Sequence, residues 1–213
     1  MKSLELRDII LAVIVLSIVA GFKSFLNLDS QTIILVIFYS IIIIALSIFS
    51  KKVAAYLLDS DIEHEMWSIT HFGFGKSSRF KNPLPAGIIL PLIFSIITLG
   101  VSKFSAILTY ETRALKYRSS KRFGFYSYTE MTDFHNGLIG AAGIFSLIIL
   151  TLITYFIPGN LEYLAKISIY YAFWNLLPIS KLDGAQIFFG SRVLWSVLFT
   201  ITSIATVLAL ITA

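Results

Sequence analysis

The residues with the clearest chemical potential lie in the stretch 175–184, which reads Asn-Leu-Leu-Pro-Ile-Ser-Lys-Leu-Asp-Gly. It is part of an apolar segment and lies near that segment's polar end. A carboxylate such as Asp183 is costly at membrane depth, so by default it marks a functional site. Pro178 interrupts a helix, and Asn175 lies one turn earlier, where it can bond the carbonyls that a proline frees. Asp183 and Asn175 are therefore candidate site residues.

The composition is that of an integral membrane protein. The chain has 213 residues, of which 57% are hydrophobic, whereas a soluble domain is nearer half apolar. There is no cysteine, so disulfides and thiolate metal sites are excluded. The net charge of +5 is typical of basic cytoplasmic loops, which favours a membrane protein over a nucleic-acid-binding one.

The apolar runs predict one domain, residues 1–213, folded as an all-α polytopic helical bundle. Each run is long enough, or nearly so, to cross a bilayer. The predicted membrane segments are 9–25, 32–58, 83–110, 137–157, 161–180 and 191–213. The segment 83–110 is too short for two crossings of at least roughly 17 residues each. With Pro91 and Gly100 inside it, this segment is either a re-entrant element or one long tilted helix.

Basic residues set the expected orientation. Two crossings return the chain to its starting side, so the basic N-terminus and Lys51-Lys52 share one face, which the positive-inside rule makes cytoplasmic. If 83–110 re-enters, the basic loops 51–82 and 111–136 are both cytoplasmic; a single crossing separates them. The Ile- and Lys-rich composition suits the cell membrane of a prokaryote or archaeon.

The three histidines do not form the usual zinc motif. Metalloproteases of the His-Glu-x-x-His type place two imidazoles one helical turn apart, beside a glutamate that activates water. The nearest string is 64–68, His-Glu-Met-Trp-Ser, which lacks the second histidine. His71 would lie about 10.5 Å from His64 along a helix axis, which makes a poor chelate. His135 is a third candidate metal ligand, with a loop histidine that touches a nearby carboxylate as the alternative.

The spacing Asn-x-x-Pro-x-x-x-Leu-Asp-Gly at 175–184 resembles the third motif of the site-2 protease family, the intramembrane zinc metalloproteases. The resemblance implies that Asp183 is a metal ligand and that 31–58, 137–157 and 161–187 form a three-helix core. It also aligns Ala55 with an alanine of the family's zinc motif. The positions of its two histidines and its glutamate are then taken by Ser47, Lys51 and Ile48.

The middle helix matches the family in part. Ala142-Gly143 is present, but Ile144 stands where the family has proline and Leu147 where it has asparagine. The resemblance therefore supports the fold and argues against the zinc chemistry. It implies a catalytically degenerate homologue, a pseudoprotease without a cofactor, that binds or regulates membrane partners.

Two other functions remain open. The first is an active intramembrane zinc protease that cleaves transmembrane substrates, with Asp183 and a histidine from among His64, His71 and His135 as ligands. The second is transport of an ion or small molecule around Asp183. The pseudoprotease, the active protease and the transporter would all lie in a lipid bilayer, and none would bind nucleic acid. The pseudoprotease would have transmembrane protein partners, and the active protease would have transmembrane protein substrates.

The positive charge of Lys51 could take the place of the metal ion. If Lys51 occupies a histidine position of the zinc motif, its ammonium group would lie beside Asp183, where the family has a zinc ion. We therefore predict that the side chains of Lys51 and Asp183 lie within about 6 Å of each other, or share a water. Ser47, one turn before Lys51, could form a Ser–Lys nucleophile pair with it; the alternative is a serine that bonds the helix backbone.

Overall fold

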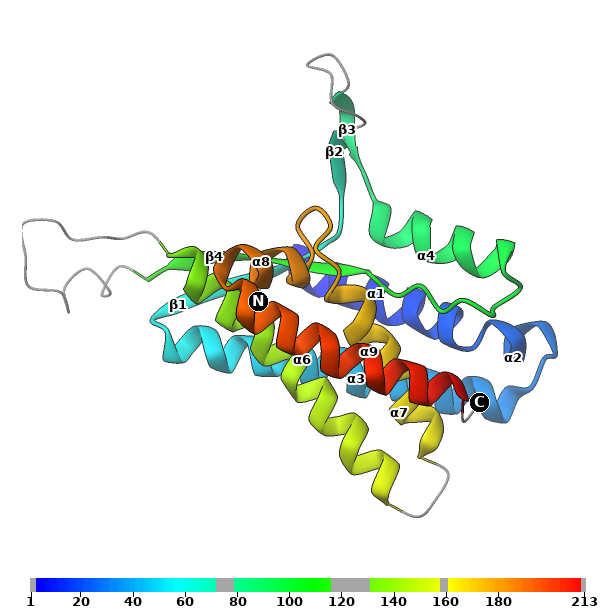
Figure 1. The fold of residues 1–213 in the computed structure, drawn as a ribbon. Helices are drawn as coiled ribbons and strands as arrows, with labels where there is room; N and C mark the ends of the chain where they lie inside the picture. The colour runs from blue at the N-terminus through cyan, green and yellow to red at the C-terminus, as the bar shows by residue number, and fades with distance from the viewer. Residues whose placement is uncertain (1–2, 72–78, 116–130, 158–160, 212–213) are drawn as a thin grey trace, which may run out of the picture.

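The computed structural model describes residues 3–71, 79–115, 131–157 and 161–211 (Figure 1). Residues 116–130 of the predicted basic loop 111–136, and residues 72–78 of the loop 51–82, lie outside the described part. The elements are, in chain order, α1 Ser3–Ala20, α2 Phe22–Leu26, α3 Ser30–Leu57, β1 Ser60–Met66, β2 Ile69–His71, β3 Arg79–Leu84, α4 Ala86–Ile97, β4 Leu108–Ala114, α6 Asp133–Phe156, α7 Glu162–Asn175, α8 Asp183–Gly190 and α9 Arg192–Ile211.

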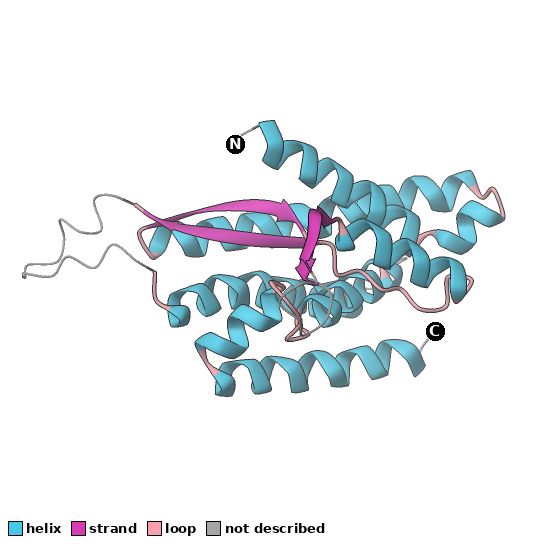
Figure 2. Cartoon of the chain, turned by 90° about the horizontal axis from the view of Figure 1, so that it is seen from above, coloured by secondary structure: helices cyan, strands magenta, loops and turns pink. Residues whose placement is uncertain are grey.

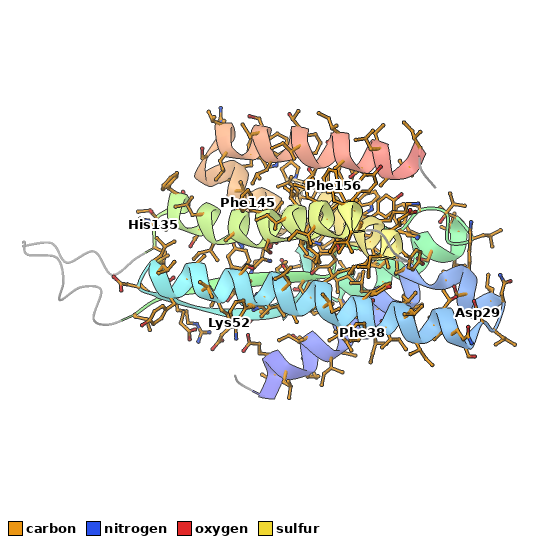
Figure 3. The ribbon with its side chains drawn as sticks, turned by 90° about the horizontal axis from the view of Figure 1, so that it is seen from below. Asp29, Phe38, Lys52, His135, Phe145 and Phe156 are labelled. Carbon is orange, nitrogen blue, oxygen red and sulfur yellow. The ribbon has the colours of Figure 1, made fainter. Side chains whose placement is uncertain are left out.

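Three of the described helices, α3, α6 and α9, are long and apolar enough to cross a membrane. The outward faces of α3 and α6 carry large apolar side chains, among them Phe38, Phe145 and Phe156 (Figure 3). Exposed apolar residues also line one side of α9. Extended apolar surfaces of this kind are rare on soluble proteins, so they suit contact with lipid. The protein is thus a mostly helical membrane protein.

The helices α1 and α7 complete the bundle but differ from these three. The first turns of α1 carry Glu5, Arg7 and Asp8, and α7 has 14 residues, fewer than the roughly 20 that a crossing needs. Most of α7 is buried, and it packs against α6 and α9. The predicted crossings at 9–25 and 161–180 therefore correspond to α1 and α7, which both contribute buried residues to the core, and whether they cross stays a prediction.

The chain is mostly helical, but the all-α class was wrong for four segments, which form strands. β1 pairs antiparallel with β4, from Ser60 opposite Ala114 to Met66 opposite Leu108 (Figure 2). In β1 the alternating side chains Ile62 and His64 are buried and their neighbours are more exposed, as expected of a half-buried strand. A second pair, β2 with β3, stands away from the helices (Figure 1).

The segment 83–110 is helical over less than half of its length. Helix α4 ends at Ile97, and the chain turns through Leu99 and Gly100, which both have positive φ. It then returns as extended chain into β4. At the far end of that strand the Leu115 N–H donates to the Asp59 carbonyl at 3.2 Å. The chain therefore leaves the end of α3 and comes back to it, a path compatible with the re-entrant alternative.

Glycines let α6 and α8 approach each other closely. A Cβ on Gly137 would lie 3.3 Å from Gly190 Cα, and one on Gly140 would lie 3.2 Å from Ile187 Cγ1. Small residues at such spacing allow helix backbones to pack in a membrane bundle. The functional candidates lie where α3, α6 and α8 come together.

Candidate functional site

Lys51 of α3 and Asp183 of α8 form a buried ion pair. Lys51 Nζ lies 2.5 Å from Asp183 Oδ2, and the two side chains are only 3% and 2% exposed. The contact predicted between these residues is therefore confirmed. Removing either partner would leave the other charge buried and uncompensated, so the two side chains act as one unit.

The stem of Lys51 runs along a glycine of α6. A Cβ on Gly143 would lie 2.5 Å from Lys51 Cε and 3.0 Å from its Cγ, so a larger residue at 143 would occupy the space of the lysine. On another side the Lys51 ammonium lies 5.0 Å from the centre of the Tyr110 ring, a cation–π contact. Residues from α3, α6 and β4 together fix the direction of the side chain.

Asp183 is positioned by the turn that joins α7 to α8. Helix α7 ends at Asn175, shortly before Pro178, and α8 begins at Asp183. A Cβ on Gly184 would lie 1.9 Å from the Leu176 carbonyl oxygen, a distance that no side chain tolerates. The Leu176 carbonyl also accepts a hydrogen bond of 3.0 Å from Trp195 Nε1, which holds it in place. The glycine after the aspartate therefore lets the turn fold back against α7.

Asn175 holds the backbone, though at different carbonyls from those expected. Its Nδ2 donates to the Tyr171 carbonyl at 2.8 Å and to the Ser105 carbonyl at 3.2 Å. The first carbonyl lies one turn earlier in α7 and the second lies in the extended chain before β4, so neither was freed by Pro178. The amide thus ties α7 to the returning chain. Its Oδ1, like Asp183 Oδ1, is buried and accepts no hydrogen bond from the described chain.

Ser47 is buried on the same face of α3 as Lys51, one turn earlier. A Ser–Lys nucleophile pair requires a free amine that takes the serine proton. Here the Lys51 amine contacts the Asp183 carboxylate, so the geometry gives this hypothesis no support.

His64 belongs to a different cluster. It is buried in β1, and its Nδ1 lies 3.4 Å from Glu5 Oε1. Glu5 in turn pairs with Lys52 at 2.7 Å. Burial first, and then the positive charge of Lys51, lower the pKa of His64 to about 3, although the Glu5 carboxylate acts in the opposite direction. The imidazole is therefore neutral at physiological pH.

The other two histidines lie elsewhere. His71 is in β2, in the strand pair that stands away from the helices, and His135 is in the first turn of α6, where it contacts Thr132 (Figure 3). Among the described residues, no three His, Cys, Asp or Glu side chains are grouped so that they could hold a metal ion.

The residues around Asp183 do not fit a zinc ion. Zinc sites of this type use neutral imidazoles and carboxylates as ligands. Position 51, which the resemblance matches to a histidine of the zinc motif, instead supplies an ammonium in direct contact with Asp183 Oδ2. An ammonium has no lone pair to give to a metal, and its charge repels a second cation at the same carboxylate.

A cleft of about 530 Å³ lies beside the ion pair, between β4, α6 and α8. Tyr110 lines the cleft, and its ring contacts the Lys51 ammonium, so this residue connects the cleft with the ion pair. The ring is held by its hydroxyl, which donates to the Asn136 carbonyl at 2.6 Å, while Gln186 Nε2 donates to the Tyr110 carbonyl at 3.0 Å. The cleft edge also carries the exposed pair Lys181–Glu111.

Sequence reasoning missed Tyr110 and the Glu5–His64 contact. Tyr110 ends an apolar run and gave no signal of its own, and Glu5 is 59 positions from His64 in the chain. Gly143 was identified as part of the Ala142-Gly143 match to the family, and its role beside Lys51 depends on the neighbouring helix.

No family model, no curated protein and no solved structure matches this chain.

Proposed function

We propose that this protein is a non-catalytic relative of the site-2 proteases, in which an internal ion pair stands in place of the metal and which acts by binding a membrane partner. The observation that carries the proposal is the contact of Lys51 with Asp183. The match of 175–184 and Ala55 to the family's motifs assigns Lys51 to a metal-ligand position, and its contact with Asp183 agrees with that assignment.

The ion pair supplies the charge balance that a metal would otherwise provide. A buried carboxylate requires a cation, and a lysine from the facing helix meets this need without an added ligand. The pair also joins α3 to α8 past Gly143 of α6. Its role in this account is to hold the three-helix core in a fixed arrangement next to the cleft.

The cleft beside β4 is the proposed binding site for the partner. Its lining combines strand residues such as Thr112 with polar side chains from the helices, including Asp133, Asn136 and Gln186. Backbone and polar groups beside a strand suit an extended peptide segment, which they can bind through its main chain. The partner that fits is a transmembrane protein whose helix becomes extended where it meets this cleft.

A designed zinc site tests the relationship to the metalloproteases. The triple variant Ser47→His, Ile48→Glu, Lys51→His replaces the lysine with two imidazoles one turn apart, facing Asp183. We expect the purified variant to bind about one zinc per chain, because two histidines and a carboxylate complete a three-ligand site. Zinc is measured by inductively coupled plasma mass spectrometry, and adding Asp183→Asn should remove it.

The matched control is Ser47→Asn, Ile48→Gln, Lys51→Asn, which introduces side chains of similar size without imidazoles. It should bind no zinc above background. If the histidine variant elutes and unfolds like the control yet also binds no zinc, positions 47 and 51 do not correspond to the metal-ligand positions, and the proposed relationship fails.

A further inference from the structure

A second pocket, of about 400 Å³, lies at the end of the bundle where α1 ends, α3 and α7 begin, and α9 ends. Three lysines line it: Lys23 of α2, Lys103 of the chain after α4, and Lys166 of α7. Ser24 and Thr32 line it as well, with the Thr32 hydroxyl donating to Asp29 Oδ2 at 2.5 Å. This pocket shares no residue with the Lys51–Asp183 site or the cleft beside β4.

Lys103 is held in this pocket by two tyrosines of α7. Its Nζ lies 4.7 Å from the centre of the Tyr163 ring and 5.9 Å from that of Tyr170. Tyr163 is itself fixed, because its hydroxyl donates to the Ala20 carbonyl at 2.6 Å. The turn that leads to Lys103 packs on α2, where a Cβ on Gly100 would meet the Phe22 ring at 2.9 Å. The ammonium is therefore placed by structure and is not a mobile surface charge.

Two of the three lysines in the pocket have no carboxylate partner within the described residues, because neither Lys23 nor Lys103 forms an ion pair there. Burial, with the nearby charges of Lys23 and Lys166, lowers the pKa of Lys103 to about 8. Like charges gathered at one place raise the free energy of the protein unless an anion joins them.

We propose that this pocket binds a phosphate group. Ammonium and hydroxyl groups are the side chains that hold phosphate oxygens in proteins. The pocket lies at the ends of membrane-crossing helices, at the level expected for lipid headgroups. Its surroundings also expose apolar side chains that suit acyl chains, namely Leu26, Leu28, Leu99 and Val101. These observations point to the headgroup of an anionic lipid as the source of the phosphate, with free phosphate as the other source.

The proposal is independent of the proposed function and is tested on the full chain in a neutral detergent. Phosphatidylglycerol, phosphatidylcholine and inorganic phosphate are added separately, and binding is measured by native mass spectrometry and by the shift of the thermal unfolding midpoint. We expect phosphatidylglycerol to bind at least tenfold more tightly than phosphatidylcholine. We also expect Lys103→Gln to abolish that preference and Lys103→Arg to retain it.

Two further variants keep the test decisive. Lys23→Gln changes an exposed residue, so it should fold normally and still weaken phosphatidylglycerol binding. The exposed Arg192, at the start of α9, lies outside the pocket, so Arg192→Gln should leave binding unchanged. A shift produced by inorganic phosphate alone and lost in Lys23→Gln assigns the site to free phosphate. Equal binding of the two lipids with no phosphate effect, or loss of binding in Arg192→Gln to the same extent, overturns the proposal.

Discussion

Replacing Asp183 with Asn while keeping Lys51 will lower the free energy of unfolding by about 3–5 kcal/mol, the cost of leaving a buried charge without its partner. Lys51→Met will cost a similar amount, because it leaves the carboxylate alone. Both side chains are almost completely buried, so solvent does not screen the loss. Equilibrium unfolding of the purified variants in mixed micelles measures these values.

The double variant Lys51→Met, Asp183→Asn should recover most of the lost stability, since both charges are then gone. The control is the exposed pair Lys181–Glu111, with the same type of contact at 3.0 Å but side chains 67% and 43% exposed. Its removal should change stability by no more than about 1 kcal/mol. Additive effects of the two buried substitutions would show that the pair does not act as a unit.

Gly184→Ala will prevent α8 from packing in its present position. The added Cβ would lie 1.9 Å from the Leu176 oxygen and 2.6 Å from the Leu177 oxygen. Both are backbone atoms that cannot move aside as a flexible side chain can. We expect a loss of at least about 3 kcal/mol, at or beyond the upper end for an overpacked core. The better helix propensity of alanine, worth about 1 kcal/mol, does not offset it.

Gly137→Ala is the matched control on α6, which packs against α8. There the new Cβ would lie 3.2 Å from the Gln186 oxygen, a contact that a shift of a few tenths of an ångström relieves. Its unfolding free energy should stay within about 1 kcal/mol of the parent protein. A Gly184→Ala protein that unfolds like Gly137→Ala would contradict the close approach of the turn to α7.

The long apolar runs predicted the helices well because length and hydropathy are properties of the local sequence. The run 32–58 became α3, 137–157 became α6 and 191–213 became α9, each with ends within a few residues. The strand β4 was missed because its first three residues, 108–110, are buried and end an apolar run, and a short apolar run cannot be told from a helix. The strand β1 lies in the polar segment after α3, where its buried face includes His64.

At the site, the motif spacing predicted the partner of Asp183 but not the surroundings of the pair. A charge within an apolar segment is visible in the sequence, and so is a lysine at an aligned position. The space beside Gly143 and the ring of Tyr110 depend on how helices and a returning strand pack, which no single segment encodes. The positions of the histidines relative to Asp183 also depend on this packing, so the sequence could name them as candidate ligands but could not show that they lie apart from Asp183.

The central claim is that the Lys51–Asp183 ion pair stands in place of a metal ion. The zinc content of the unmodified protein tests it most directly. The full chain is purified with zinc supplied during expression, alongside Asp183→Asn, and metal per chain is measured by inductively coupled plasma mass spectrometry. We expect the same background zinc in both proteins, because Lys51 is in contact with the Asp183 carboxylate. About one zinc per chain in the parent protein, lost in Asp183→Asn, would contradict it.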